Sequence, residues 1–116
     1  MTKIYLTQTG FFTARHGHGG ALAEASHEHT FRYEITFHGP LNAEGYLIDF
    51  RDLSAAFKKE IDARFEGKDL CTFFENPTTE ALCIWIYRRI NDLFPHLYSV
   101  KVAEAEDRWT EYRGEE

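Results

Sequence analysis

The sequence predicts an α+β domain with the order strand, strand, helix, helix, strand, strand, in which a four-stranded antiparallel sheet carries two helices on one face. Three observations predict this fold. Two early runs alternate apolar and polar residues, two amphipathic segments follow, and a third alternating run lies near the end. The 116 residues are 43% hydrophobic and 16% aromatic, so residues 1–116 are expected to form a single domain around one packed core.

The first two strands are predicted from period-two alternation, which places every second side chain on the same face. The first run ends at His16, and the second begins at His27 and breaks at 38–42. The apolar face of the first run comprises Ile4, Leu6, Phe12, Ala14 and His16. The apolar face of the second comprises His27, His29, Phe31, Tyr33, Ile35 and Phe37. Both strands therefore place histidines on their apolar side, partly shielded from water.

The two helices are predicted from apolar residues that recur every three or four positions. The first helix is expected to begin near Asp49 or Arg51 and to stop at Gly67, because glycine suits the position after a helix end. Asn76 is the expected N-cap of the second helix, with Pro77 as its first residue. The apolar stripes are Phe50, Leu53, Phe57 and Ile61 in the first helix, and Leu82, Ile86, Ile90 and Leu93 in the second.

The C-terminal part of the chain is predicted to complete the sheet. Tyr98, Val100, Val102 and Glu104 alternate along one face of a third strand, and residues 108–112 are expected to pair back as a fourth. Such a sheet has two open edges, and its outer strands are not heavily protected. Since closing the sheet into a barrel between subunits removes those edges, we expect a homo-oligomer.

Composition narrows the classes of partner and the location. A formal net charge of −6 argues against a surface for nucleic acid or an anionic membrane. No stretch is long and apolar enough to span a membrane, and the N-terminus has no signal-peptide pattern. Cys71 and Cys83 are interpreted as free thiols in a reducing cytoplasm, with Cys83 in the core; a disulfide between them is the alternative.

Three histidines are the strongest functional signal. His27 and His29 share a face, and His16 lies across from them if the two runs pair as an antiparallel hairpin. Three neutral imidazoles leave Zn²⁺ its full charge and an open coordination position, which is typical of a catalytic zinc. His18 is a second-ranked alternative or additional ligand, because it faces away from His16 if the strand continues. Three ordinary core or surface histidines remain the plainer interpretation.

Other polar residues are candidates for binding or proton transfer. Glu104 continues the apolar parity of its strand, and its carboxylate can accept two parallel N–H groups from the edge of a pterin or guanine ring. Thr78, Thr79 and Glu80 offer hydroxyls and backbone N–H groups that can hold a ring carbonyl or an anion. Glu24, three residues before His27, can act as a general acid or base. Each has a plainer interpretation. Glu104 can be a solvated residue at a strand end, residues 78–80 can simply cap a helix, and Glu24 can be an exposed loop residue.

These residues together resemble the 6-pyruvoyltetrahydropterin synthase and 6-carboxytetrahydropterin synthase family. The resemblance covers nearly the whole chain and rests on five motifs in order. They are residues 12–16 (F-x-A-x-H), 27–29 (H-G-H, with Glu28 replacing the glycine), 45–53 (G-hydrophobic-x-x-D-F-x-x-L), 75–80 (E-N-P-T-x-E) and 100–104 (V-x-V-x-E).

The resemblance implies a tunnelling fold (T-fold), in which three subunits complete a twelve-stranded barrel and two trimers stack into a homohexamer. It implies zinc at His16, His27 and His29. It also implies a pterin held between subunits by Glu104, with help from residues 78–80. The substrate of the family is 7,8-dihydroneopterin triphosphate, and the product is a 6-pyruvoyl, 6-carboxy or 6-hydroxymethyl pterin.

Two departures from the family pattern bear on activity. The family's catalytic cysteine lies four residues before the first histidine of H-G-H, where this chain has Ala23. A subgroup that makes 6-hydroxymethyl-dihydropterin instead carries a glutamate three residues before that histidine, and Glu24 fits this spacing. The family's Asp-His pair after the first helix is reduced at most to Asp62.

Three hypotheses follow from the sequence. The first is a zinc-dependent lyase that acts on 7,8-dihydroneopterin triphosphate or a related pterin, with Glu24 as the acid/base. The second is a pterin-binding homologue without catalysis that serves as a carrier, sensor or interaction module. The third is a purely structural hexamer, against which Glu104 and residues 77–80 argue.

Overall fold

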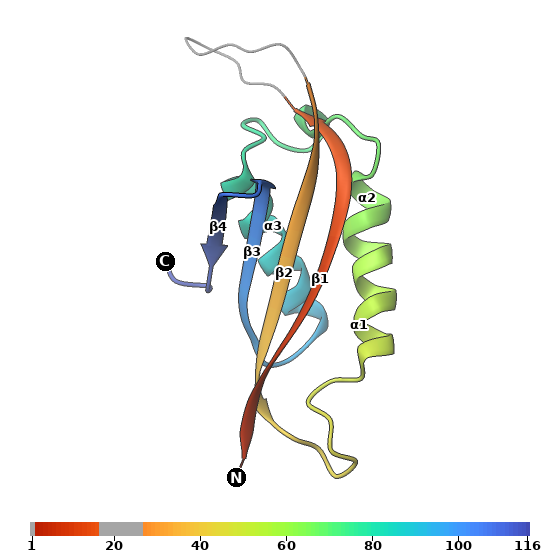
Figure 1. The fold of residues 1–116 in the computed structure, drawn as a ribbon, viewed down its shortest axis with the longest axis vertical. Coiled ribbons are helices and arrows are strands. Elements are labelled where there is room, and N and C mark those ends of the chain that lie inside the picture. Colours follow the sequence, from red (N-terminus) through yellow and green to blue (C-terminus); the bar gives the residue numbers. More distant parts are fainter. Residues whose placement is uncertain (1, 17–26) are drawn as a thin grey trace.

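The computed structural model describes residues 2–16 and 27–116 and has the predicted α+β architecture (Figure 1). Its elements are β1 (Lys3–His16), β2 (His27–Pro40), α1 (Phe50–Phe57), a π-helical segment (Lys58–Asp62), α2 (Ala63–Phe65), a short 3-10 helix (Leu70–Thr72), α3 (Thr79–Leu93), β3 (Leu97–Ala105) and β4 (Arg108–Tyr112). The π-helical segment was not predicted, and it interrupts the first helix.

The four strands form one antiparallel sheet in the order β1-β2-β3-β4. The register between β1 and β2 is continuous from Lys3 opposite Pro40 to His16 opposite His27. This register confirms the predicted hairpin. It brings the end of β1 and the start of β2 to the same corner of the sheet, where all three histidines of the sequence prediction lie.

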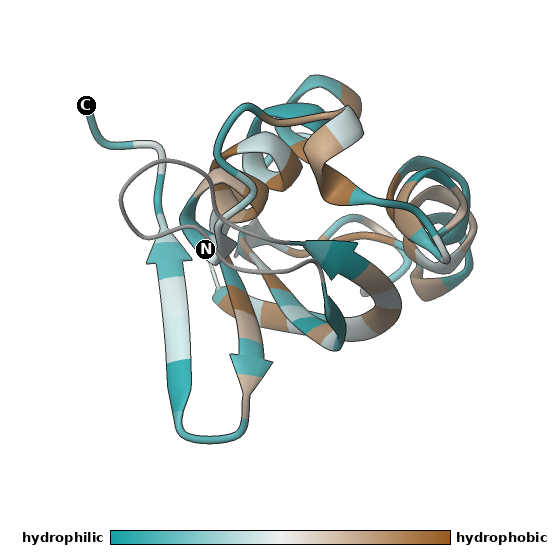
Figure 2. Ribbon diagram, turned by 90° about the horizontal axis from the view of Figure 1, so that it is seen from above, coloured by the Kyte–Doolittle hydropathy of each residue, from teal (hydrophilic) through white to brown (hydrophobic). Residues whose placement is uncertain are grey.

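The hydrophobic core lies between one face of the sheet and the helices (Figure 2). The predicted faces of the strands are the more buried ones except at Glu104, and β3 also buries Ser99 and Ala103 on its other face. The predicted helical stripes are buried except at Phe50 and Leu93, which are exposed. Fully or almost fully buried hydrophobic residues of the sheet are Phe12, Ala14, Phe31, Tyr33, Ile35, Phe37, Val100, Val102 and Ala103. Those of the helical segments are Leu53, Phe57, Ile61, Phe65, Leu70, Leu82, Cys83, Ile86 and Ile90.

The ends of the helices follow the sequence prediction in part. Asp49 caps α1, since its carboxylate accepts a hydrogen bond from the backbone N–H of Arg51 at 2.8 Å. Gly67 adopts a φ of 71° directly after the last helical turn, as expected of a glycine stop. The predicted start of α3 was wrong. Its N-cap is Thr78, whose hydroxyl accepts from the N–H of Ala81 at 3.0 Å.

Cys83 packs in the core as predicted. It is a free thiol that donates a hydrogen bond to the Val100 carbonyl at 3.0 Å, so the alternative disulfide does not form. Burial raises the pKa of the Cys83 thiol to about 12, which keeps it protonated and unreactive. Across residues 2–16 and 27–116, none of the helices combines the length and the apolar character that crossing a bilayer requires.

Gly10 is required by the packing of the β1–β2 hairpin. It lies opposite Tyr33, and a Cβ atom at position 10 would overlap the Tyr33 ring and hydroxyl. The Tyr33 hydroxyl is held in place because it donates a hydrogen bond to Asp62 at 2.8 Å. We therefore expect Gly10→Ala to lower the free energy of unfolding by about 1–3 kcal/mol, measured by urea denaturation. Thr9→Ala, at the exposed neighbouring position, is the control; an unchanged midpoint for Gly10→Ala would contradict this packing.

Candidate metal centre

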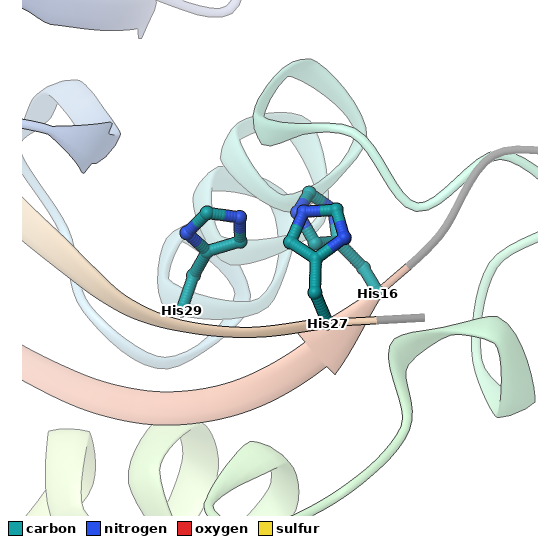
Figure 3. A group of neighbouring side chains, drawn as sticks. All are labelled: His16, His27 and His29. Carbon is teal, nitrogen blue, oxygen red and sulfur yellow. The ribbon is translucent and has the colours of Figure 1, made fainter. Parts of the chain in front are cut away.

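Three imidazole rings converge at the corner where β1 ends and β2 begins. Figure 3 shows the side chains of His16, His27 and His29 gathered on the same side of the two strands. Their ligating nitrogens all lie within 4.8 Å of one another. The ring centroids are 4.4 Å apart for His27 and His29, and 5.0 Å apart for His16 and either partner. This is the only group of three or more potential metal ligands in the described part of the chain.

His16 is held from behind by the loop that leads into α3. Its side chain is only 3% exposed, and its Nδ1 lies 2.8 Å from the backbone carbonyl oxygen of Pro77. A carbonyl can only accept, so Nδ1 carries the hydrogen and donates it. In the neutral ring the lone pair is then on Nε2. Metal-binding histidines are commonly oriented by such a hydrogen bond from the opposite nitrogen.

This donor set fits a divalent transition metal. Three neutral imidazoles suit Zn²⁺, and a site with only three protein ligands leaves a coordination position for water or substrate. The tautomer imposed on His16 by Pro77 is the one that metal binding through Nε2 requires. The corner of the sheet can therefore hold a Lewis acid that polarises an oxygen atom of a bound molecule.

Glu104, the predicted anchoring carboxylate, lies beside this cluster. Its Oε2 atom is 3.0 Å from Nε2 of His16 and 3.9 Å from Nε2 of His29. The side chain is 39% exposed, so the carboxylate remains accessible from solvent. The parity of β3 explains this placement: Val100 and Val102 are buried on the helix-covered face, and Glu104 continues that face beyond the core.

The start of α3 reaches the same corner through Pro77. The hydroxyl of Thr78 caps the helix, whereas that of Thr79 donates to the Glu80 carboxylate at 2.9 Å and lies 3.2 Å from the Thr110 hydroxyl on β4. All three residues predicted to bind a ligand here therefore already have partners within the chain. The contact between Pro77 and His16 was not predicted, because no local sequence pattern signals it.

Of the residues considered for proton transfer, only Asp62 lies within the described part of the chain. Glu24 lies outside the described residues, as do Ala23 and His18. Asp62, predicted as the most that this chain keeps of the family's Asp-His pair, accepts the hydrogen bond from Tyr33. Burial raises the pKa of Asp62 above its usual range, and the hydrogen bond from Tyr33 opposes this rise. Burial also raises the pKa of the Tyr33 hydroxyl. The hydrogen-bonded pair joins β2 to the π-helical segment, so it is part of the packing between these two elements.

A sequence model of the family described as 6-pyruvoyl tetrahydropterin synthase matches residues 5–115 of the chain. The chain belongs to this family. Its members process pterins, and the three motifs that bring His16, Pro77 and Glu104 together lie within the matched segment.

Two curated proteins are similar in sequence to this chain. A putative 6-carboxy-5,6,7,8-tetrahydropterin synthase from Archaeoglobus fulgidus is 31% identical over 105 residues, which cover 90% of each chain. A dihydroneopterin monophosphate aldolase from Pyrococcus furiosus is 35% identical over 75 residues, covering 62% of this chain and 61% of that protein.

Solved structures of the family share the fold. The 6-pyruvoyl tetrahydropterin synthase of Caenorhabditis elegans superposes with a TM-score of 0.87, at 16% identity, over 99% of this chain and 98% of that one. A Plasmodium vivax 6-pyruvoyltetrahydropterin synthase, carrying alanine in place of a catalytic glutamate, superposes with a TM-score of 0.77 at 14% identity, over 97% and 98% of the two chains. The predicted T-fold subunit is thus confirmed.

Proposed function

We propose that this protein is a zinc-dependent lyase that cleaves the side chain of 7,8-dihydroneopterin triphosphate or of a closely related pterin. The observation that carries the proposal is the convergence of His16, His27 and His29 beside the Glu104 carboxylate. Membership of a pterin-processing family supports the class of substrate. The product is a 6-pyruvoyl, 6-carboxy or 6-hydroxymethyl pterin.

Each part of the site has a distinct role in this proposal. The three histidines would hold Zn²⁺, which when bound polarises a hydroxyl oxygen of the substrate side chain. Glu104 accepts N–H groups from the edge of the pterin ring and so fixes its orientation. Residues 78–80 at the start of α3 contact the same ring. Glu24 takes or returns the proton that moves when the side chain is cleaved.

Carbon–carbon cleavage to a 6-hydroxymethyl product is the variant of this reaction that the comparisons favour. Ala23 stands where the family has its catalytic cysteine, and Glu24 supplies a carboxylate one residue later. The relative from Pyrococcus furiosus is named an aldolase, and the Plasmodium vivax enzyme has a catalytic glutamate. A glutamate acting as the acid/base in this chain agrees with both.

The direct test is product analysis. Purified protein loaded with Zn²⁺ is incubated with 7,8-dihydroneopterin triphosphate and, separately, with the monophosphate, and the pterins formed are separated by chromatography. We expect conversion to one of the three products. Binding of the pterin without any conversion would instead support the non-catalytic homologue. The missing cysteine, and the missing histidine of the family's Asp-His pair, already argue for that alternative.

We also propose that the active form is a homohexamer, because the two outer strands present edges that a neighbouring copy can pair with. Segment 66–69 covers β1 only near its end: Gly67 donates to the Thr13 carbonyl at 2.7 Å, and Arg15 donates to the Lys68 carbonyl at 2.9 Å. Residues 3–11 lie on the outer edge of the sheet beyond that cover. Phe11 on β1 and Trp109 on β4 are 65% and 42% exposed, as expected of side chains near a subunit contact.

A proline on the open part of β1 tests this assembly. The backbone groups of Thr13 and Arg15 point outward, so alternation places the N–H of Thr9 outward as well. Thr9→Pro removes this donor without breaking a bond to β2, which an edge strand tolerates. Light scattering is expected to give the mass of six chains for wild type and for Thr9→Ala, and a smaller folded species for Thr9→Pro. A hexamer that survives Thr9→Pro would rule out pairing along this edge.

A further inference from the structure

Glu104 lies closer to the histidine cluster than a residue that only anchors a substrate ring needs to be. Its Oε2 atom is 3.0 Å from Nε2 of His16, which is the buried member of the cluster. The same oxygen is 3.9 Å from Nε2 of His29. One carboxylate oxygen therefore faces two of the three nitrogens that can bind a metal.

The chemistry of the His16–Glu104 contact calls for a cation between the two atoms. Because His16 donates its Nδ1 hydrogen to Pro77, its Nε2 atom in the neutral ring carries a lone pair. An ionised carboxylate oxygen is also acceptor-only, so the two atoms repel each other at 3.0 Å. Either a second proton on His16 or a metal ion bound by both atoms relieves this repulsion.

The spacing agrees with a shared metal ion. Zinc lies about 2.0–2.2 Å from imidazole nitrogens and carboxylate oxygens, so neighbouring ligand atoms in a tetrahedral site are separated by roughly 3.3 Å. The two separations from the Glu104 oxygen, 3.0 and 3.9 Å, lie on either side of this value. The carboxylate thus lies next to two corners of a site formed by the three imidazoles, whose own ligand atoms all lie within 4.8 Å of one another.

We propose that Glu104 is the fourth ligand of the metal ion when no substrate is present. This inference rests on the proposed function, since it requires that His16, His27 and His29 bind the ion. The resting site is then closed to water, as in a structural zinc site. A carboxylate bound to the metal cannot at the same time accept the N–H groups of a pterin ring, so binding of the ring and opening of the coordination position occur together.

X-ray absorption spectroscopy of the zinc-loaded, full-length protein tests this directly. We expect three imidazole nitrogens and one carboxylate oxygen around zinc in wild type, and a water oxygen in place of the carboxylate in Glu104→Gln. Loss of even an outer-shell partner typically weakens metal binding by about 10–100-fold, so the Kd of Glu104→Gln for Zn²⁺, measured by chelator competition, should rise at least about 10-fold. Glu106→Gln is the matched control, because Glu106 is 89% exposed on the same hairpin.

The outcomes separate this inference from the proposed function. Zinc bound by three imidazoles and water in wild type would overturn the role of Glu104 and leave the proposed function standing. An unchanged Kd and spectrum in Glu104→Gln would do the same. A wild-type protein that retains no zinc would overturn both. The wild-type spectrum alone decides the matter if Glu104→Gln fails to fold.

Discussion

His27→Ala is expected to abolish zinc retention. His27 supplies one of three imidazoles from the corner of the sheet, and two imidazoles with an exposed carboxylate make a much weaker site. If the roughly 10–16 kcal/mol measured for four-ligand zinc sites is shared evenly, one ligand is worth about 3 kcal/mol, or at least ~100-fold in Kd. Zinc per chain after gel filtration, measured by mass spectrometry, should fall from about one to near zero.

Thermal unfolding gives a second readout that does not depend on activity. A ligand that binds only the folded state stabilises it by about 2.7 kcal/mol at one hundred times its Kd. Added Zn²⁺ should therefore raise the Tm of wild type but not that of His27→Ala. His38→Ala is the control, because His38 lies on the same strand but stacks on Tyr5 at 4.0 Å, outside the histidine cluster. Unchanged zinc content in His27→Ala would overturn the assignment of the ligands.

The convergence of the histidines could be predicted from the sequence because it depends on local rules. Alternation assigns a face to every strand residue, and a slip of one residue in the pairing of β1 with β2 would expose the whole apolar set. Burial of residues such as Phe12 and Phe31 therefore fixes the register, and with it the position of His16 opposite His27.

The contacts that complete the site could not be predicted in this way. The hydrogen bond from His16 to Pro77 and the approach of Glu104 to His16 join residues that are far apart in the sequence. They depend on how the loop before α3 and the end of β3 meet the corner of the sheet. The motifs drew attention to these residues, but alternation and helical spacing do not determine distances between different elements.

The start of α3 shows how such a contact overrides a local signal. Asn76, Thr78 and Thr79 are all favourable N-cap residues, and Pro77 suits the first helical position. Local preferences therefore leave the start uncertain by two or three residues. In the structure Pro77 remains outside the helix, and its carbonyl accepts the hydrogen bond from His16. The tertiary contact and the Thr78 cap together set where the helix begins.

Glu24→Gln is expected to lower kcat by about 10²–10⁴-fold, the usual contribution of general acid–base catalysis. Glutamine keeps the size of the side chain but cannot exchange a proton at neutral pH. If Glu24 transfers a proton in the reaction and does not bind the metal or the ring, zinc content and the Kd for the pterin should not change. The loss would then appear in kcat, with KM largely preserved. Turnover of 7,8-dihydroneopterin triphosphate and pterin binding are measured on the same preparation.

Glu28→Gln separates this effect from a general loss of negative charge near the histidines. Glu28 is exposed and lies between His27 and His29, where strand alternation directs its side chain to the opposite face of the sheet. Wild-type turnover in Glu28→Gln together with a large loss in Glu24→Gln therefore assigns the proton transfer to Glu24. Equal turnover in wild type and Glu24→Gln would assign the proton to another group. Ala23, at the position of the family's cysteine, cannot exchange a proton in place of Glu24. If wild type and Glu24→Gln are both completely inactive but still bind the pterin, this member of the family binds pterins without converting them.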